Sequence, residues 1–294
     1  MSTLHRQQSF QDEKNKGILY LVPTPIGNLE DMTFRAVRIL KEADLIAAED
    51  TRNSKKLCSY FDIHTPLVSH HEHNKEASTR DLIMRLTRGE KIALVSDAGM
   101  PCISDPGYEL ATACIREGIP VVPLPGANAA LTALIASGIA PQPFTFYGFL
   151  PREKQEKRAA LERLAKIPST FILYEAPHRL KHTLQMMAEV LGERQISISR
   201  ELTKKFEEFL RGTIQEAVEW VENNEVRGEF CLVVEGSPET GEEDDDFWWT
   251  ALSVKEHVEA YMQQKQLPAK EAIKLAAKDR KLPKREVYQI YHEL

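Results

Sequence analysis

The chain has 294 residues, a formal net charge of −6 and 42% apolar residues. This apolar content suffices for one large or two medium cores, and no apolar run approaches the roughly 18 residues that a membrane span needs. The acidic balance gives no sign of general nucleic-acid affinity, so an RNA or DNA partner would have to be held by a local basic patch.

Neither the beginning of the chain nor its cysteines indicate export. Residues 1–16 are polar, lack the apolar centre of a signal peptide, and are expected to be a disordered lead-in. The cysteines are scattered without a CxxC pair, at Cys58, Cys102, Cys114 and Cys231. This pattern predicts a reduced cytoplasmic protein with no membrane association and no structural metal.

Residues 17–139 are predicted to form a first α/β domain. Short apolar runs alternate with helical patterns, and strands are expected at 18–22, 44–48, 66–69, 91–95 and 119–124. A helix capped by Asp31 or Thr33 follows the first run, and its spacing predicts a buried face with Phe34, Val37 and Leu40. Because open α/β sheets bind ligands at the carboxyl ends of their strands, the loops there are the candidate sites.

The stretch 94–107, LVSDAGMPCISDPG, is the most distinctive of these loops. Gly99 can supply a positive φ and a close backbone approach to a ligand, while Pro101 and Pro106 stiffen the path. Asp97 and Asp105 add acids. The alternative is an ordinary connection between a strand and a helix with a glycine turn.

Two further segments that directly follow predicted strands are also candidate sites. The PTPIGN segment, residues 23–28, is too rich in proline and glycine for a helix or strand and is predicted to be a rigid loop. The run Glu49, Asp50, Thr51, Arg52 follows the second strand. It is either a site or a helix cap with a surface salt bridge.

Two other segments have both a functional and a structural interpretation. In HHEHN, residues 70–74, the histidines suggest zinc, but no metal-ligand spacing surrounds them, and a substrate-facing role is the better functional alternative. The PGANAALTAL segment starting at Pro125 can cradle an anion at a helix N-terminus, or its alanines can serve tight packing. It lacks GxGxxG, so NAD is not supported.

The rest of the chain divides into three parts. Residues 140–236 are predicted to be a second, more mixed α/β domain after a hinge near residue 140, with the main pocket between the two domains. An acidic linker is expected at 237–247. Residues 248–294 should form three short helices interrupted by Pro268 and Pro283. From residue 265 onward eight Lys and Arg face four Asp and Glu, a local charge of +4. A helix-turn-helix-like module that touches nucleic acid and a merely solvated helical face both fit this charge.

Several of these segments together resemble a known family. VPTPIGNLEDMT, AAEDTR, LVSDAGMPCISDPG, PLPGANAALTAL, FYGFLP, YEAPHR and RELTK, in this order from about residue 18 to 236, are similar to the bacterial 16S ribosomal RNA (cytidine-2′-O)-methyltransferases. That family belongs to the tetrapyrrole methylase-like superfamily of S-adenosylmethionine enzymes. One departure is Met100, where the family usually has a smaller threonine.

The resemblance implies a two-domain tetrapyrrole-methylase-like α/β fold with a small C-terminal helical module, acting as a homodimer. It also implies 2′-O-methylation of a cytidine ribose at the decoding centre of the small ribosomal subunit, in 16S rRNA, with S-adenosylmethionine as cofactor. The expected cofactor-binding residues are Ala98, Gly99, Cys102, Ile103, Pro125, Gly126, Ala127, Tyr174, Leu202 and Gly228.

Methyl transfer to a ribose hydroxyl also requires a proton acceptor, because this hydroxyl is a weak nucleophile. The candidates are Glu49 or Asp50, which we favour, a histidine of HHEHN, Asp105 and Glu201. Guanidinium groups match phosphate and ribose oxygens, and Arg52 is grouped with the catalytic acids. The expected substrate-binding residues are Pro25, Asn28, His71, His73, Arg179 and Arg200. Two rival functions remain open: methylation of a small tetrapyrrole, and a non-catalytic module that binds S-adenosylmethionine.

Overall fold

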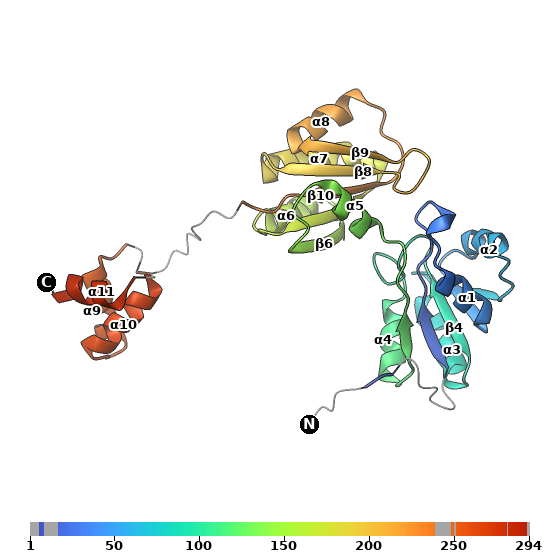
Figure 1. Cartoon of the computed structure of the whole chain (residues 1–294), viewed down its shortest axis with the longest axis horizontal. Helices are drawn as coiled ribbons and strands as arrows, with labels where there is room; N and C mark the ends of the chain where they lie inside the picture. Colours follow the sequence, from blue (N-terminus) through green and yellow to red (C-terminus); the bar gives the residue numbers. More distant parts are fainter. Residues whose placement is uncertain (1–5, 9–16, 239–247, 250, 281, 293–294) are drawn as a thin grey trace. The chain divides into compact units, whose positions relative to one another are not determined.

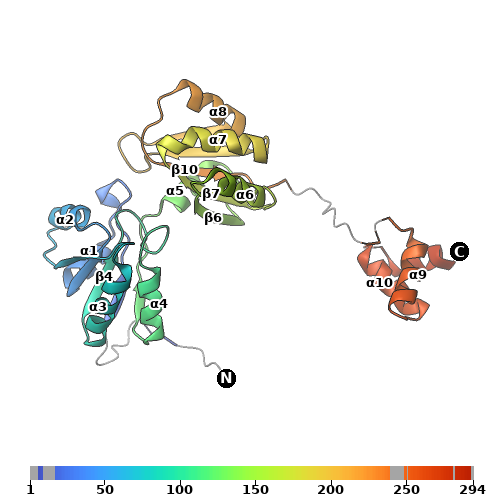
Figure 2. The same ribbon diagram turned by 180° about the vertical axis from the view of Figure 1, so that it is seen from behind.

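We describe the fold from a computed structural model, which covers residues 6–8, 17–238, 248–249, 251–280 and 282–292. The chain separates into two compact units, Met1–Pro238 and Glu239–Leu294, described one after the other (Figures 1 and 2). The expected lead-in at 1–16 and acidic linker at 237–247 lie mostly outside the described residues.

The first unit begins with a five-stranded parallel sheet in the order β3-β2-β4-β1-β5. Its strands are β1 (Ile18–Leu21), β2 (Leu45–Ala48), β3 (Leu67–Ser69), β4 (Lys91–Val95) and β5 (Val121–Pro123). Each lies within or next to a predicted run. The sheet has a hydrophobic cluster on each face. Burial on both faces is why these strands are continuous apolar runs instead of alternating ones.

Four helices and one short turn of 3-10 helix accompany this sheet. They are η1 (Leu29–Asp31), α1 (Phe34–Glu42), α2 (Thr51–Tyr60), α3 (Lys75–Thr87) and α4 (Tyr108–Arg116). Thr33 caps α1 as predicted, since its hydroxyl accepts a hydrogen bond from the Ala36 amide. The predicted buried face is wrong in one position: Phe34 is 96% exposed, because the buried stripe runs through Ala36, Ile39 and Leu40 on the opposite side of the helix.

The second sheet is mixed, as the sequence predicts, with the order β6-β7-β10-β8-β9. Its strands are β6 (Phe144–Phe149), β7 (Thr170–Glu175), β8 (Gln195–Arg200), β9 (Glu208–Thr213) and β10 (Phe230–Val234). Only β6 and β7 pair in parallel; β10 is antiparallel to both of its neighbours. All five residues of β10 are buried, as expected for a central strand covered on both faces.

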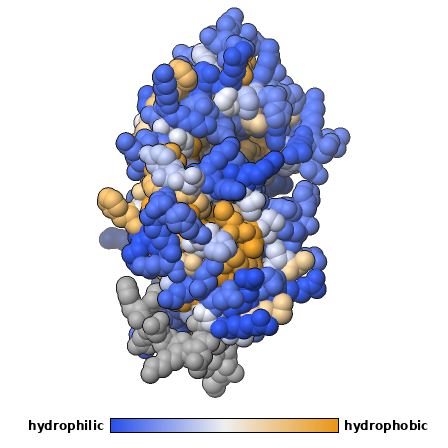
Figure 3. Space-filling model, turned by 90° about the vertical axis from the view of Figure 1, so that its right-hand side faces the viewer, coloured by the Kyte–Doolittle hydropathy of each residue, from blue (hydrophilic) through white to orange (hydrophobic). Residues whose placement is uncertain are grey.

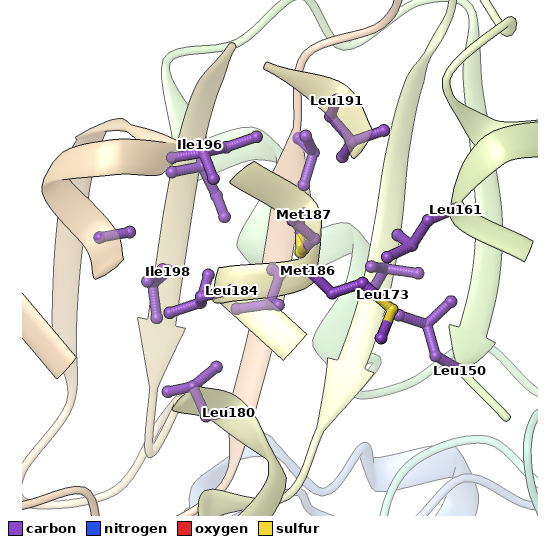
Figure 4. Packing of buried hydrophobic residues seen from close by; sticks show 14 of the residues in the cluster. Leu150, Leu161, Leu173, Leu180, Leu184, Met186, Met187, Leu191, Ile196 and Ile198 are labelled. Atoms are coloured by element: carbon purple, nitrogen blue, oxygen red, sulfur yellow. The ribbon is translucent and has the colours of Figure 1, made fainter. Parts of the chain in front are cut away.

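One face of this sheet holds the largest core of the chain. It packs against α6 (Lys154–Leu164), α7 (Pro177–Leu191) and α8 (Ile214–Asn223). Figure 4 shows Leu184 and Met187 of α7 between Ile198 of β8 and Leu173 of β7. Close packing of this kind makes the second sheet and its helices a rigid support for the loops at the strand ends.

The other face of the second sheet is covered by α5 (Ala129–Ser137). Its small side chains Ala130 and Ala133 pack with Ile172, Cys231 and Val233 of the sheet. The predicted domain boundary at 139 and 140 would leave this helix with the first domain, whereas its contacts are with the second sheet. The alanines therefore serve close helix–sheet packing, the structural alternative given for this segment.

The second unit contains the three predicted helices α9 (Val254–Gln264), α10 (Ala269–Asp279) and α11 (Lys284–His292). Pro268 and Pro283 each stand immediately before a helix, where the missing amide proton does no harm. The helices share a small core that includes Val258, Ile273 and Val287.

The surface is mainly hydrophilic on the face that Figure 3 shows, as expected for a chain with 28% charged residues. Apolar side chains gather near the middle of this face. No helix in the described part of the chain is long and apolar enough to cross a membrane.

Candidate functional site

A cavity of about 510 Å³ lies in the first unit, among loops that follow strands of both sheets. The loop after β4 and the segment after β7 form much of the wall, together with the start of α5 and residues of β8 and β10. Most of its wall is apolar. The lining includes Ile26, Ala98, Gly99, Met100, Ile103, Asp105, Asn128, Ala129, Phe149, Tyr174, Ser199, Leu202 and Cys231. A mainly apolar cavity with a few polar groups is typical of a site for a small molecule.

The loop after β4 is fixed by the PTPIGN loop. Thr24 and Gly99 exchange both backbone hydrogen bonds, at 2.9 and 3.0 Å, and the Thr24 hydroxyl donates to the Ser96 carbonyl. Gly99 has φ +80° as predicted, and an added Cβ would lie 3.3 Å from Ile26. Glycine is therefore required both for the backbone conformation and for the close approach of the two loops.

Three of the four cofactor residues predicted in this loop line the cavity, and Cys102 does not. The Cys102 side chain packs instead beneath the loop: its Sγ would lie 2.9 Å from a Cβ added at Gly107. Cys102 and Ser104 both have a positive φ, a conformation that costs energy for residues with a side chain and is common at ligand sites. Met100, the departure from the family pattern, is part of the cavity wall.

The predicted anion cradle at Pro125, Gly126 and Ala127 is not in the cavity wall, which begins with Asn128 and Ala129. Gly126 lies against Pro23, where an added Cβ would be only 2.6 Å from the proline Cβ. Two first-turn amides of α5 are already occupied within the chain, by the Asn128 side chain and by the Tyr174 hydroxyl at 3.2 Å. An anion site at this helix end is thus disfavoured.

Tyr174 and Leu202 line the cavity as predicted, while Gly228 supports it from behind. Gly228 has φ +92°, and a Cβ there would lie 2.6 Å from the Glu201 side chain. It therefore holds the neighbouring Glu229 in the wall without facing the cavity itself.

An acidic cluster, defined as Glu49, Asp97 and Asp105, combines two loops of the first sheet. Asp105 lines the cavity. Burial, with the nearby charges of Glu49 and Asp97, raises the pKa of Asp105 to about 7. Burial and Asp97 also raise the pKa of Glu49, whose Oε2 has no hydrogen-bond partner among the described residues. Burial and like charge therefore make both carboxyl groups easier to protonate than an exposed acid.

Asp50 and Arg52 have a different role from Glu49. Asp50 caps α2 by accepting from the Arg52 amide at 2.8 Å, and its carboxylate pairs with the Arg52 guanidinium at 2.6 Å. Hydrogen bonds from Arg52 lower the pKa of Asp50 to about 2. Asp50 is therefore poorly suited to accept a proton. Of the two alternatives given for this segment, Asp50 and Arg52 fit the helix cap with a surface salt bridge. Arg52 itself is 86% exposed.

The predicted substrate residues near the first sheet lie outside the cavity wall. Pro25 lines a second hollow of about 330 Å³ together with Asp97. The Asn28 amide donates to the Thr203 hydroxyl at 3.1 Å, which ties the PTPIGN loop to the loop after β8. The Nδ1 atom of His71 has no partner among the described residues, and the rings of His71 and His73 are 5.9 Å apart.

The two predicted substrate arginines are occupied inside the chain. Arg179 donates to the Leu150 carbonyl at 2.6 Å and pairs with Glu175 at 3.1 Å. Arg200 donates to the Arg227 carbonyl at 2.7 Å. The prediction that they hold phosphate is therefore disfavoured, because a partly buried guanidinium that turns to a phosphate leaves its carboxylate or carbonyl partner unpaired.

Glu201, a candidate proton acceptor, is occupied as well. Burial opposes its ionisation, but a hydrogen bond from Lys204 at 2.9 Å and one from the Glu229 amide make the pKa of Glu201 lower than usual. A carboxylate that is already bonded and readily ionised is a weak base.

Sequence reasoning missed the buried polar network beneath the cavity. The Glu175 carboxylate accepts from the Thr183 hydroxyl at 2.6 Å and from the Ala176 amide, and Lys157 donates to Thr183 at 2.9 Å. YEAPHR marks the place in sequence, but its burial depends on α6 and α7, which no local pattern reveals. The network fixes the segment after β7 that lines the cavity.

The polar groups in and near the cavity bear on the kind of ligand it can hold. No three His, Cys, Asp or Glu side chains among the described residues come together as metal ligands. Ser199 is one of the residues that line the cavity, and its buried hydroxyl has no hydrogen-bond partner among the described residues. A buried hydroxyl of this kind is normally satisfied by a ligand or by water.

The sequence model of the tetrapyrrole (corrin/porphyrin) methylase family matches residues 18–218 of this chain. The chain belongs to this family. The match, which includes the cavity loops up to residue 218, confirms the resemblance seen in the motifs.

Curated relatives match this chain over almost its whole length. Ribosomal RNA small subunit methyltransferase I of Bacillus subtilis (strain 168) is 62% identical over 98% of this chain and 99% of its own length. The proteins of that name from Halalkalibacterium halodurans and Synechocystis sp. are 59% and 48% identical, over 98% and 95% of this chain and 99% and 98% of their own lengths. Since the relatives match almost end to end, the C-terminal unit is included in the likeness.

Solved structures confirm the predicted fold class. A cobalt precorrin-4 methyltransferase has a TM-score of 0.57 at 18% identity, over 74% of this chain and 94% of its own. A uroporphyrin-III C-methyl transferase from Thermus thermophilus, complexed with S-adenosyl homocysteine, has a TM-score of 0.53 at 20% identity, over 74% and 97%. At these identities the likeness concerns the fold.

Proposed function

We propose that this chain transfers the methyl group of S-adenosylmethionine to a cytidine ribose 2′-hydroxyl of 16S rRNA in the small ribosomal subunit. The observation that carries the proposal is the 62% identity, over nearly the whole chain, to a protein named for methylation of small-subunit ribosomal RNA. The acidic cluster and most of the cavity wall lie within residues 18–218, the segment that the family model matches, and supply a place for that chemistry.

The cavity fits S-adenosylmethionine by its chemistry. The cofactor supplies a methyl group on a positively charged sulfur. The apolar wall of Ile103, Phe149 and Leu202 suits the uncharged parts of such a molecule. Polar residues of the wall, such as Ser104 and Asn128, can bind its polar groups. Asp105 places negative charge in the wall, which favours a cation over an anion. Gly99 and Tyr174 are the positions in which we expect substitution to weaken binding most.

Asp105 is the proposed proton acceptor. It is the member of the acidic cluster that lines the cavity, and its pKa of about 7 suits a base near neutral pH. The cofactor would supply the methyl group and leave as S-adenosylhomocysteine when its carbon–sulfur bond breaks, and the Asp105 carboxylate would take the proton of the attacking ribose hydroxyl. Glu49 and Asp97 are positioning residues that keep the Asp105 pKa high. This assignment moves the base from Glu49 or Asp50 to Asp105 in the neighbouring loop.

The partner and setting follow from the same proposal. We expect the enzyme to act in the cytoplasm, on 16S rRNA within the assembled small subunit, as a homodimer. Exposed apolar side chains of the first unit, such as Ile135 of α5 and Phe206, are available for contact with a second copy.

The decisive experiment uses S-adenosylmethionine with a radiolabelled methyl group. Small subunits from cells without this enzyme, free 16S rRNA and a corrinoid precursor are offered side by side. Label in the RNA, mapped to a cytidine ribose, is the expected result. Label in the tetrapyrrole alone would leave the family in place and overturn the substrate. Tight cofactor binding without label in any substrate would favour a binding module.

A further inference from the structure

The C-terminal unit carries a basic surface that the catalytic assignment does not use. The family model ends at residue 218, before this unit begins. Although the whole chain has a net charge of −6, residues 265–294 have eight basic and four acidic residues, a local charge of +4. An enzyme with an acidic body and a ribosomal RNA substrate needs such a local contact.

The lysines of α10 occupy its solvent face. Lys270, Lys274 and Lys278 follow one another at intervals of four residues, so they lie on one side of the helix. The opposite side is buried through Ala272, Ile273 and Ala276. The three lysines are exposed, and none pairs with a carboxylate of a described residue. Glu271 is the one acidic neighbour on this side of α10.

Two other cations of the unit, Arg280 and Lys265, are engaged in its own structure. Arg280 donates to the Leu252 carbonyl and to His257 Nδ1, and its guanidinium lies 5.3 Å from the centre of the Trp249 ring. The Lys265 ammonium lies 4.7 Å from the centre of the Tyr261 ring. These cations stabilise the fold, whereas the α10 lysines have no structural task among the described residues.

The outer face of α11 adds cations and aromatic rings. Lys284, Tyr288 and His292 repeat at intervals of four, and Arg285 lies beside them. Tyr288 is 48% exposed, and its ring centre is 4.3 Å from that of His292. An exposed aromatic ring with neighbouring cations is the combination with which proteins stack an unpaired base and hold its phosphate.

We infer that the C-terminal unit is an RNA-binding surface, in which the α10 lysines contact phosphates and Tyr288 of α11 stacks an unpaired base. This inference rests on the proposed function, because it assumes an RNA substrate. It assigns the unit to substrate capture and leaves cofactor binding and methyl transfer to the first unit. Binding through phosphates is salt-dependent, whereas stacking is much less so, and this difference separates the two contacts experimentally.

The test uses the full chain and in vitro transcribed 16S rRNA over a series of salt concentrations. The variant Lys270→Gln, Lys274→Gln, Lys278→Gln is compared with a control that loses the same charge from α6 and the residues after it: Lys154→Gln, Arg163→Gln, Lys166→Gln. Loss of three phosphate contacts lowers the slope of log K against log salt by about 2 to 3 and weakens binding at least about tenfold at moderate salt. The control is expected to change binding less than about twofold.

Tyr288 is tested separately. Tyr288→Ala is expected to weaken RNA binding about tenfold with an unchanged salt slope, and Tyr288→Phe, which keeps the ring, to restore it. Thermal unfolding of each variant should match that of the parent chain, since all these side chains are exposed.

Three outcomes have distinct meanings. Equal affinity and slope in the α10 variant and the parent chain would overturn the inference; coverage of the lysines by the acidic run 242–246 of the same chain would give this result. Equal losses in the variant and the α6 control would also overturn it, because the effect would then be general charge. If binding depends on α10 but the parent chain methylates no ribosomal RNA, the proposed function fails and the RNA surface remains.

Discussion

Replacement of Asp105 by asparagine should change activity and stability in opposite directions. Asparagine keeps the size of the side chain but cannot accept the ribose proton, so methyl transfer is expected to fall about 10²- to 10⁴-fold. Affinity for S-adenosylmethionine should change much less. Methyl transfer by the parent chain should rise with pH through about 7, where Asp105 loses its proton, and then level off.

The effect on stability follows from the same raised pKa. Between pH 4 and 7 the unfolded chain releases the Asp105 proton and the folded chain keeps it, so stability decreases as the pH rises. The rise from 3.8 to about 7 corresponds to about 4 kcal/mol at most. Because Asp105 is only partly buried, solvent screening reduces this to about 2 kcal/mol. Above pH 7 the Asp105→Asn chain should therefore be more stable than the parent.

The assays are single-turnover methyl transfer between pH 5.5 and 8.5 and urea unfolding at pH 5 and 8. Glu49→Gln is the matched variant: it removes one negative neighbour, so the midpoint of the activity profile should move to lower pH. A purely structural role of Glu49 would not move that midpoint. Full activity of Asp105→Asn, or a profile that is flat between pH 6 and 8, would refute the assignment of the base.

Three further substitutions probe the site and the surface. Gly99→Ala forces a side chain into φ +80° beside Ile26 and should cost about 1–2 kcal/mol of stability and weaken cofactor binding, measured by calorimetry; unchanged affinity would contradict the tight loop pairing. Thr183→Val leaves buried oxygens of Glu175 short of a hydrogen bond and should lower the free energy of unfolding by about 1–3 kcal/mol, with a larger Kd for the cofactor. Phe34→Ser should change the unfolding free energy by less than about 0.5 kcal/mol; a shift to monomers in sedimentation would instead show that a second copy covers this residue.

The strands of the first unit and the helices of the C-terminal unit were predictable because their sequence signals are local. The buried parallel strands are short apolar runs, and α10 and α11 begin directly after Pro268 and Pro283, the two prolines that interrupt the helical pattern. Phe34 shows the limit of such patterns. Spacing predicts that a helix has one apolar face, but the packing partners of α1 decide which face is buried. The contacts of α5 with the second sheet were likewise decided by packing across sequence segments.

The site was only partly predictable, for the same reason. Gly99 and Tyr174, which the motif resemblance implies as cofactor residues, do lie in the cavity wall. The distinction between Asp50 and Asp105 could not be predicted, because both are acids that follow strands. The two acids differ in their surroundings. Asp50 has a guanidinium within hydrogen-bond distance, whereas Asp105 is partly buried in the cavity wall near two other carboxylates. Such surroundings come from segments that meet only in the folded chain.

The surroundings of Asp105 also explain why a raised pKa suits this reaction. A proton acceptor of this kind begins as an anion and becomes neutral as it works. Partial burial and the charges of Glu49 and Asp97 disfavour the anion and leave the neutral form almost unaffected. The protein thereby destabilises the state from which the proton transfer starts, and it loses about 2 kcal/mol of stability above pH 7 by doing so. An acid held by an arginine, like Asp50, would have the opposite energetics: its anion is stabilised, and taking up a proton would break a salt bridge. Under the proposed assignment, the two acids therefore divide the tasks at this edge of the sheet: Asp50 holds α2 in place, and Asp105 accepts the proton.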